Sequence, residues 1–333
     1  MPGSGGSAAT TAGSGSTTGG SGSTTGGSGS EGGGSGGGGG SGGGGDPGPA
    51  CPKPAPGICH EFVANDNGGN YVIYVDEFTS TKPGAVVWKV PVTSDGQNSP
   101  RTIEIVNNAA AKGGKAVMVS IKAGFVELDL TDGTKVAEVK LANTTNVTGA
   151  CRMPDGNTAL GSDTQIRIVS PTGAPVRAFN LPAGNELRAI NRNPTTGNFW
   201  FSKTETVYEV NDQGVQVWKA SLGAGAKGYA VWWREGGGAY GTTGDPSTVV
   251  EINQAGAIVS QVGGKANFDA FDFFSGFVRQ PNGNYIVANW LGHLASPGSD
   301  QPHVVELTPG NELVWQWGTQ EFARQITNVF VFR

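Results

Sequence analysis

The stretch Pro281–Trp317, PNGNYIVANWLGHLASPGSDQPHVVELTPGNELVWQW, decides the fold of this chain. It contains a turn, a strand, a long loop, a second strand, a glycine turn and a third strand. Its short Val- and Ile-rich runs alternate apolar with polar residues and show almost no helical periodicity. We therefore expect a small antiparallel sheet whose strands follow one another along the chain.

Weaker copies of this stretch run back through the sequence. Each copy has two strands joined by a glycine turn, and the copies lie at 71–90, 125–141, 165–181, 206–220, 248–262 and 303–317. The turn glycines, 40 to 54 residues apart, are Gly84, Gly133, Gly173, Gly214, Gly256 and Gly310. Three copies also share a tryptophan at the same place, at Trp88, Trp218 and Trp315. A second hairpin with its own glycine turn precedes each later copy, so each unit holds four strands.

Six such units predict an all-β fold, a six-bladed β-propeller with four-stranded antiparallel blades. The N-terminal unit supplies only three strands, at 60–66, 71–77 and 85–90. The segment 326–332 is left over at the C-terminal end. We therefore expect the C-terminal strand to join the N-terminal blade and to close the ring.

The unit with PNGN, then VAN, then a Val/Glu strand and a Val-Trp strand resembles the repeats of PQQ-like and arylsulfotransferase-like propellers. The resemblance covers the folded region loosely and implies blades, because its motifs are structural. Arylsulfotransferase-like proteins use a histidine near the channel mouth, and the corresponding segment 271–280, FDFFSGFVRQ, has none. Neither a vicinal cysteine pair nor metal-binding carboxylates of PQQ enzymes is identifiable, so the sequence predicts no cofactor and no metal site.

Residues 1–50 are almost entirely Gly, Ser, Thr and Ala, so we expect a disordered tether before a propeller at 51–333. A net charge of −5 argues against a nucleic-acid partner, and no apolar run is long enough for a membrane span. The tether is typical of a surface-anchored protein outside the cytoplasm, whose native precursor would carry an export signal or a lipidated cysteine. A cytosolic protein is the alternative.

The chain has three cysteines, and two of them bear on its location outside the cytoplasm. Cys51 and Cys59 bracket a Pro/Gly-rich loop and are candidates for a disulfide, with two free thiols as the alternative. Cys151 lies among small apolar residues and is expected in the core rather than as a nucleophile.

The long loops 91–100, 263–274, 290–302 and 317–326, with the shorter 65–70, fall on one face of the predicted ring, in blades 5, 6 and 1. Loops on a rigid scaffold often carry binding residues. The hypothesis of a ligand site there, which a sugar would suit, names Phe271, Phe273, Trp290, Asp300, Arg324 and Asn65. The hypothesis of an acid–base site there names His293, His303, Asp269 and Asp272. The alternatives are a loop packed on its own phenylalanines and solvated or hydrogen-bonded histidines.

Five of the six innermost strands end in arginine, on the opposite face of the ring. The functional interpretation is an anion site, and the alternative is a repeated structural residue that bonds carbonyls or acids nearby. These residues are Arg152, Arg192, Arg234, Arg279 and Arg333.

Three functions remain open from the sequence. The first is a secreted or surface-tethered propeller that binds a small molecule, a carbohydrate or a protein through blades 5, 6 and 1. The second is an enzyme on the same scaffold, a polysaccharide lyase or hydrolase rather than an arylsulfotransferase-like protein. The third is a structural protein of a surface or matrix.

Overall fold

The computed structural model describes residues 51–53, 57–92, 99–142, 146–184, 186–293 and 301–333. All of them belong to the compact unit Gly36–Arg333. The predicted tether, residues 1–50, lies outside the described residues. Within the described part of the chain, no helix is long and apolar enough to cross a membrane.

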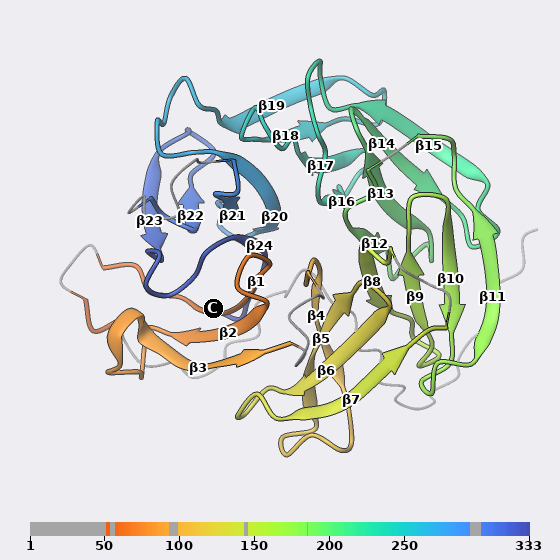
Figure 1. Cartoon of the computed structure of the whole chain (residues 1–333). Coiled ribbons are helices and arrows are strands. Elements are labelled where there is room, and N and C mark those ends of the chain that lie inside the picture. Colours follow the sequence, from red (N-terminus) through yellow and green to blue (C-terminus); the bar gives the residue numbers. More distant parts are fainter. Residues whose placement is uncertain (1–50, 54–56, 93–98, 143–145, 185, 294–300) are drawn as a thin grey trace, which may run out of the picture. The chain divides into compact units, whose positions relative to one another are not determined.

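The strands of the described residues form six four-stranded antiparallel sheets around a common axis (Figure 1), which confirms the predicted six-bladed propeller. From the innermost strand outward, blade 1 consists of β24 (Ile326–Val331), β1 (Glu61–Asp66), β2 (Tyr71–Asp76) and β3 (Val86–Pro91). Blade 2 consists of β4 (Ile103–Asn107), β5 (Lys115–Ile121), β6 (Gly124–Asp129) and β7 (Lys135–Lys140). Blade 3 consists of β8 (Gly149–Arg152), β9 (Thr158–Gly161), β10 (Gln165–Val169) and β11 (Pro175–Asn180). Blade 4 consists of β12 (Ile190–Arg192), β13 (Phe199–Lys203), β14 (Thr206–Val210) and β15 (Gln216–Ser221). Blade 5 consists of β16 (Val231–Trp233), β17 (Ala239–Thr242), β18 (Thr248–Ile252) and β19 (Ile258–Gly263). Blade 6 consists of β20 (Phe273–Arg279), β21 (Tyr285–Trp290), β22 (Val304–Leu307) and β23 (Leu313–Trp317).

The ring is closed by strand pairing between the two ends of the propeller. Strand β24 pairs antiparallel with β1 from Phe62 opposite Val331 to Asp66 opposite Ile326. The ladder continues past the strand, because the backbone N–H of Glu61 donates to the carbonyl of Arg333 at 2.9 Å. The expected closure is therefore confirmed, and blade 1 is completed by the C-terminal strand.

The three repeated tryptophans have a common role in linking blades. The indole N–H of Trp88 donates to the carbonyl of Leu130 at 3.1 Å, from blade 1 to blade 2. That of Trp218 donates to the carbonyl of Gln254 at 2.9 Å, from blade 4 to blade 5. That of Trp315 donates to the Glu77 carboxylate at 2.9 Å, from blade 6 to blade 1. A large apolar ring with one polar atom suits this position, because it packs against the next blade and also bonds to it.

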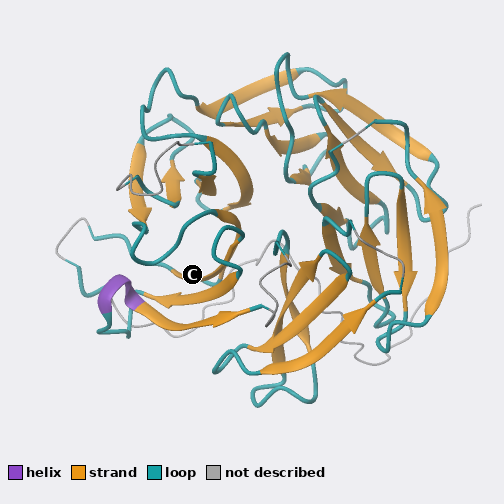
Figure 2. Ribbon diagram, viewed as in Figure 1, coloured by secondary structure: helices purple, strands orange, loops and turns teal. Residues whose placement is uncertain are grey.

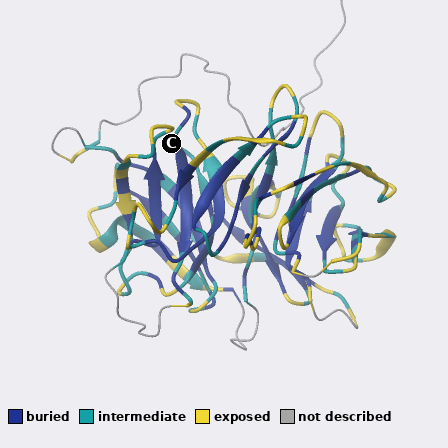
Figure 3. Cartoon of the chain, turned by 90° about the horizontal axis from the view of Figure 1, so that it is seen from above, coloured by how far each residue is buried: buried dark blue, intermediate teal, exposed yellow. Residues whose placement is uncertain are grey.

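The apolar core lies between neighbouring blades. One cluster joins Trp200 and Val207 of blade 4 to Val231 and Val250 of blade 5. The second strand of each blade is almost entirely buried, and exposed positions are most frequent on the outermost strands (Figure 3). In the described residues the elements other than strands are turns, loops and one short 3-10 turn at Pro83–Ala85 (Figure 2).

The turn glycines are needed where blades approach closely. Gly214 has a φ of 81°, and a Cβ there would lie 2.6 Å from the ring of Phe179 in the preceding blade. Both constraints favour glycine. In the last copy the left-handed position is Asn311, with a φ of 65°, and not the neighbouring Gly310.

Lys203 holds the connection from blade 3 to blade 4 on the face that carries the long loops. It is buried at the end of β13, and its Nζ donates to the carbonyls of Asp163 at 2.5 Å, Pro182 at 2.6 Å and Gly184 at 3.2 Å. Burial lowers the pKa of this ammonium, and the nearby Asp163 carboxylate opposes the effect. The connection that leads to Arg188 is thus fixed by one side chain.

We predict that Lys203→Met lowers the free energy of unfolding by about 2–4 kcal/mol, because three carbonyls lose their donor. Urea unfolding followed by tryptophan fluorescence measures the change. Lys219→Met on the exposed strand β15 is the matched control, and we expect it to change stability by less than about 0.5 kcal/mol. Equal stability of the two variants would show that the carbonyls find other partners.

Candidate functional site

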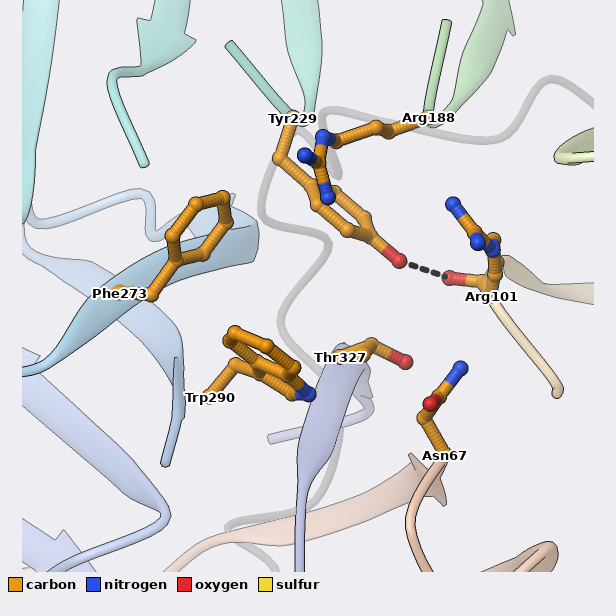
Figure 4. A pocket seen from close by; sticks show the side chains of 7 residues that line it. All are labelled: Asn67, Arg101, Arg188, Tyr229, Phe273, Trp290 and Thr327. Atoms are coloured by element: carbon orange, nitrogen blue, oxygen red, sulfur yellow. Dashed lines mark hydrogen bonds between the residues drawn. The ribbon is translucent and has the colours of Figure 1, made fainter. Parts of the chain in front are cut away.

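One cavity lies at the mouth of the central channel, on the face that carries the connections between blades and the loops between second and third strands. We call this face the upper face and the cavity the upper-mouth cavity. Its volume is about 60 Å³. The side chains of five blades line it (Figure 4): Asn67, Arg101, Arg188, Tyr229, Phe273, Trp290 and Thr327.

Tyr229 spans the channel mouth. It enters from the connection before β16 in blade 5, and its hydroxyl donates to the backbone carbonyl of Arg101, before β4 in blade 2, at 3.2 Å (Figure 4). These blades face each other across a six-membered ring. Burial raises the pKa of the Tyr229 hydroxyl, and the positive charges of Arg101 and Arg188 partly oppose this. The hydroxyl therefore stays protonated at neutral pH and acts as a donor.

Two arginines give the cavity a positive side. The Arg188 guanidinium lies over the ring of Phe273, 5.3 Å from its centroid. Its Nη2 lies 3.4 Å from the carboxylate of Glu186, and its buried Nε has no hydrogen-bond partner in the described part of the chain. Arg101 approaches from the same side in Figure 4. Since no lining residue carries a carboxylate, the cavity wall itself is cationic.

Two aromatic rings form the apolar side of the cavity, across from Arg101 (Figure 4). Phe273 begins β20 and Trp290 ends β21, and their rings meet edge to face at 5.4 Å. Behind them, the His293 ring stands edge to face against Trp290 at 4.8 Å. The wall is therefore a packed aromatic cluster, able to offer a flat apolar surface to a ligand.

Of the residues predicted to bind ligand, Phe273 and Trp290 line the cavity. Phe271 does not, because it packs in the core against Phe268 and Phe274, at 4.6 and 4.8 Å between ring centroids. Its ring has no free face for stacking, and the loop is folded on its own phenylalanines.

The other predicted ligand residues are placed differently. Asn65 is buried, and its Oδ1 accepts the hydroxyl of the cavity residue Thr327 at 3.1 Å. Arg324 is exposed, and its backbone N–H donates to the Asp66 carboxylate at 3.0 Å. Asp300 lies outside the described residues.

The structure brings together His293 and Asp272 and adds Asp245. The His293 Nδ1 lies 3.2 Å from the Asp245 carboxylate and 3.8 Å from that of Asp272. Asp272 also accepts the His293 backbone N–H at 3.0 Å. The imidazole side chain is 47% exposed and lies beside the aromatic wall, and Asp245 Oδ1 is within ion-pair distance of its Nδ1 without forming a hydrogen bond. Asp269 is exposed and lies in the same loop as Asp272, residues 263–274.

His303 is apart from this group and is fully buried, with 0% exposure. Neither ring nitrogen has a hydrogen-bond partner among the described residues. Burial lowers its pKa to about 4, so the ring is neutral at physiological pH. A site open to solvent cannot use it for proton transfer in this position, which corrects its expected catalytic role.

We predict that His303 makes the fold acid-sensitive. Its pKa falls from 6.5 in the unfolded chain to about 4 in the folded one, so the unfolded chain takes up the proton first. The resulting stability is present above pH 6.5 and is lost as the pH falls toward 4. His303→Leu should remove about 2–3 kcal/mol of the loss measured by urea unfolding between pH 7 and pH 4.5. Between pH 7 and pH 8, the free energies of unfolding of wild type and variant should change in parallel. If both also lost the same stability between pH 7 and pH 4.5, the assignment to His303 would be wrong.

We call the face opposite to the upper face the lower face. Three of the five arginines predicted there each pair with a nearby acidic side chain. Arg152 contacts the Glu127 carboxylate, and its Nη1 donates to a backbone carbonyl at 2.8 Å. Arg234 pairs with Glu251 at 2.5 Å, and Arg333 pairs with Glu61 at 2.7 Å. These three charges are compensated locally.

The remaining two lower arginines make other contacts. Arg279 lies over the Tyr240 ring at 5.2 Å, and Arg192 has a buried Nε without a partner in the described part of the chain. The contacts of the other four arginines favour the repeated structural role over a shared anion site.

The cysteines are as expected. Cys51 and Cys59 form a disulfide with their Cα atoms 5.5 Å apart. Cys151 is a buried free thiol, and burial raises its pKa well above the usual range, so it is poorly suited to act as a nucleophile. Among the described residues, no group of three His, Cys, Asp or Glu side chains is arranged to hold a metal ion.

The propeller is similar to a protein of unknown function from Bacteroides caccae, with a TM-score of 0.65 and 20% identity, covering 83% of this chain and 100% of that one. It is also similar to a streptogramin B lyase, with a TM-score of 0.54 and 12% identity over 82% of this chain and 90% of that one. The fold is a six-bladed propeller of this type. A virginiamycin B lyase from Staphylococcus aureus is similar too, with a TM-score of 0.50 and 11% identity over 77% and 83% of the two chains.

At sequence identities this low, the structural similarity supports the fold alone. No protein-family model and no curated protein matches the sequence. Membership of the PQQ-like or arylsulfotransferase-like propellers is therefore not shown, and the structural likeness is to streptogramin B lyase-type propellers.

Sequence reasoning missed most of the cavity, although a repeat signal was present. Arg101, Arg188 and Tyr229 each lie two residues before the innermost strand of their blade. An alignment of the blades on that strand would have brought these large polar residues to one position. Asn67 and Thr327 had no comparable signal.

Proposed function

We propose that the protein is a ligand-binding propeller whose upper-mouth cavity receives one group of a small organic molecule. The observation that carries this proposal is the convergence of side chains from five blades on one cavity at the channel mouth. About 60 Å³ corresponds to roughly two water molecules, so the rest of a ligand would lie over the rim. The rim includes loops of blades 5, 6 and 1, and a carbohydrate or protein ligand would have to present a small group to the same cavity.

We predict that Trp290→Ala weakens ligand binding at least tenfold, because the aromatic wall loses its largest surface. A chemically diverse set of fragments, screened by ligand-observed NMR against wild type, supplies the probes. Val259→Ala on the outer strand β19 is the matched control and should leave binding unchanged. Fragments that bind equally well to wild type and to Trp290→Ala would place the binding site elsewhere.

Acid–base catalysis is a second candidate, favoured by the exposed His293 between two carboxylates. Asp245 faces Nδ1, which leaves Nε2 free to accept or donate a proton. An exposed imidazole of this kind could serve as the general acid or base of a polysaccharide lyase or hydrolase on this scaffold.

For this candidate we predict that His293→Gln lowers turnover at least a hundredfold, because the proton-transfer group is lost. A panel of polysaccharides assayed for new reducing ends and for unsaturated products measures turnover. Asp245→Asn should lower the rate, since the imidazole loses a carboxylate 3.2 Å from its Nδ1. Unchanged turnover in His293→Gln would exclude this site.

We also propose that the protein works outside the cytoplasm. The Cys51–Cys59 disulfide supports this location, because such bonds persist in oxidising compartments. A tether with a lipid anchor remains part of the same proposal.

A further inference from the structure

We infer that the group recognised by the upper-mouth cavity is a carboxylate or a similarly small oxyanion, carried on an aromatic or other flat apolar body. The inference rests on the proposed function, since it specifies the chemical class of ligand for that same cavity. It depends on the charge of the lining, on unused hydrogen-bond donors and on the arrangement of the two walls.

The charge of the cavity is opposite to that of the chain. The chain carries a net charge of −5, whereas the lining contains two arginines and no acid. Arg101 forms no ion pair with any described residue. Arg188 has Glu186 at 3.4 Å, but that carboxylate is 46% exposed and the contact is long. Exposed pairs of this kind are worth little, so much of the positive charge at the cavity remains uncompensated.

The neutral polar groups of the lining already use donor hydrogens within the protein. The Tyr229 hydroxyl hydrogen is used by the carbonyl of Arg101, and the Asn67 amide N–H donates to the carbonyl of Pro100 at 3.3 Å. The Thr327 hydroxyl is 3.1 Å from both Asn65 Oδ1 and the Pro100 carbonyl. The guanidinium N–H groups are thus the main unused partners, and they offer no acceptor to an ammonium ion.

Arg188 supplies the most specific indication. Its guanidinium is packed on Phe273, its side chain is only 23% exposed, and its buried Nε lacks a partner. A buried donor without a partner is rare and calls for an explanation. The N–H groups of a guanidinium form a fork that matches the two oxygens of a carboxylate. A bound carboxylate would satisfy this donor and would be held away from bulk water.

The arrangement of the positive side and the aromatic side of the cavity determines which body the oxyanion can be attached to. Figure 4 shows Phe273 and Trp290 across the cavity from Arg101, with Tyr229 between them. An oxyanion near the arginines would leave an attached flat apolar group against the aromatic wall.

The test uses matched probes on the whole chain. Benzoate, phenylacetate and 3-phenylpropionate are compared with the corresponding phenyl alcohols and with phenethylammonium, by calorimetry and saturation-transfer NMR. We expect at least one of the carboxylates to bind at least tenfold more tightly than its alcohol, and its affinity to fall as salt is raised. Phenethylammonium should not bind.

Variants assign the effect to residues. Arg188→Gln should weaken carboxylate binding at least tenfold and alcohol binding much less, and Arg188→Lys should give an intermediate loss of carboxylate binding. Arg177→Gln on the outer strand β11 is the matched control and should bind like wild type. Glu186→Gln should tighten carboxylate binding severalfold, because the competing negative charge beside Arg188 is removed from an exposed position. This last variant keeps the test valid if a change at Arg188 impairs folding.

The outcomes separate the two proposals. If alcohols bind as well as carboxylates and all binding is lost in Trp290→Ala, the cavity is a ligand site but the anion inference is wrong. If carboxylates bind but neither the Arg188 nor the Glu186 variants change their affinity, the inference is also wrong. If no probe and no fragment binds at this cavity, the proposed function fails as well.

Discussion

Antiparallel pairing of β24 with β1 is the constraint on which the rest of the structure depends. Each blade exposes an apolar face that it cannot cover alone, and it packs on both neighbours. An open row of blades would leave two such faces in water. The C-terminal strand joins residues of one sheet that are about 260 positions apart, and so gives every blade two neighbours. Tryptophan N–H groups of the outermost strands reinforce the contacts between blades.

Closure also creates the site. The Tyr229 hydroxyl reaches the carbonyl of Arg101 across the ring, and Thr327 enters from the closing strand itself. Neither contact exists unless all six blades are in place. The upper-mouth cavity is therefore a property of the closed ring, and its shape should respond to changes in blade packing as well as to changes in its lining.

The balance of charge distinguishes the two faces. On the lower face, three arginines each have a carboxylate from a nearby strand, so their charges are compensated within the same blade or by the neighbouring one. On the upper face, Arg188 is held over Phe273 by a connection that Lys203 fixes through three carbonyls. A guanidinium positioned by a rigid neighbour needs little reordering to bind an anion, which lowers the cost of association.

The sequence by itself determined the blades and the strand left over to close the ring, because alternation, turn glycines and repeat spacing can be read along the chain. It offered a Cys51–Cys59 disulfide beside the alternative of two free thiols, and the structure shows the disulfide. It also pointed to Phe273 and Trp290 through the long loops of the last blade. Only the tertiary structure decided that Phe271 and His303 are buried, that Asp245 rather than Asp269 faces His293, and that Arg101, Arg188 and Tyr229 meet. These contacts join positions far apart in the chain, and the curvature of the closed ring sets their distances.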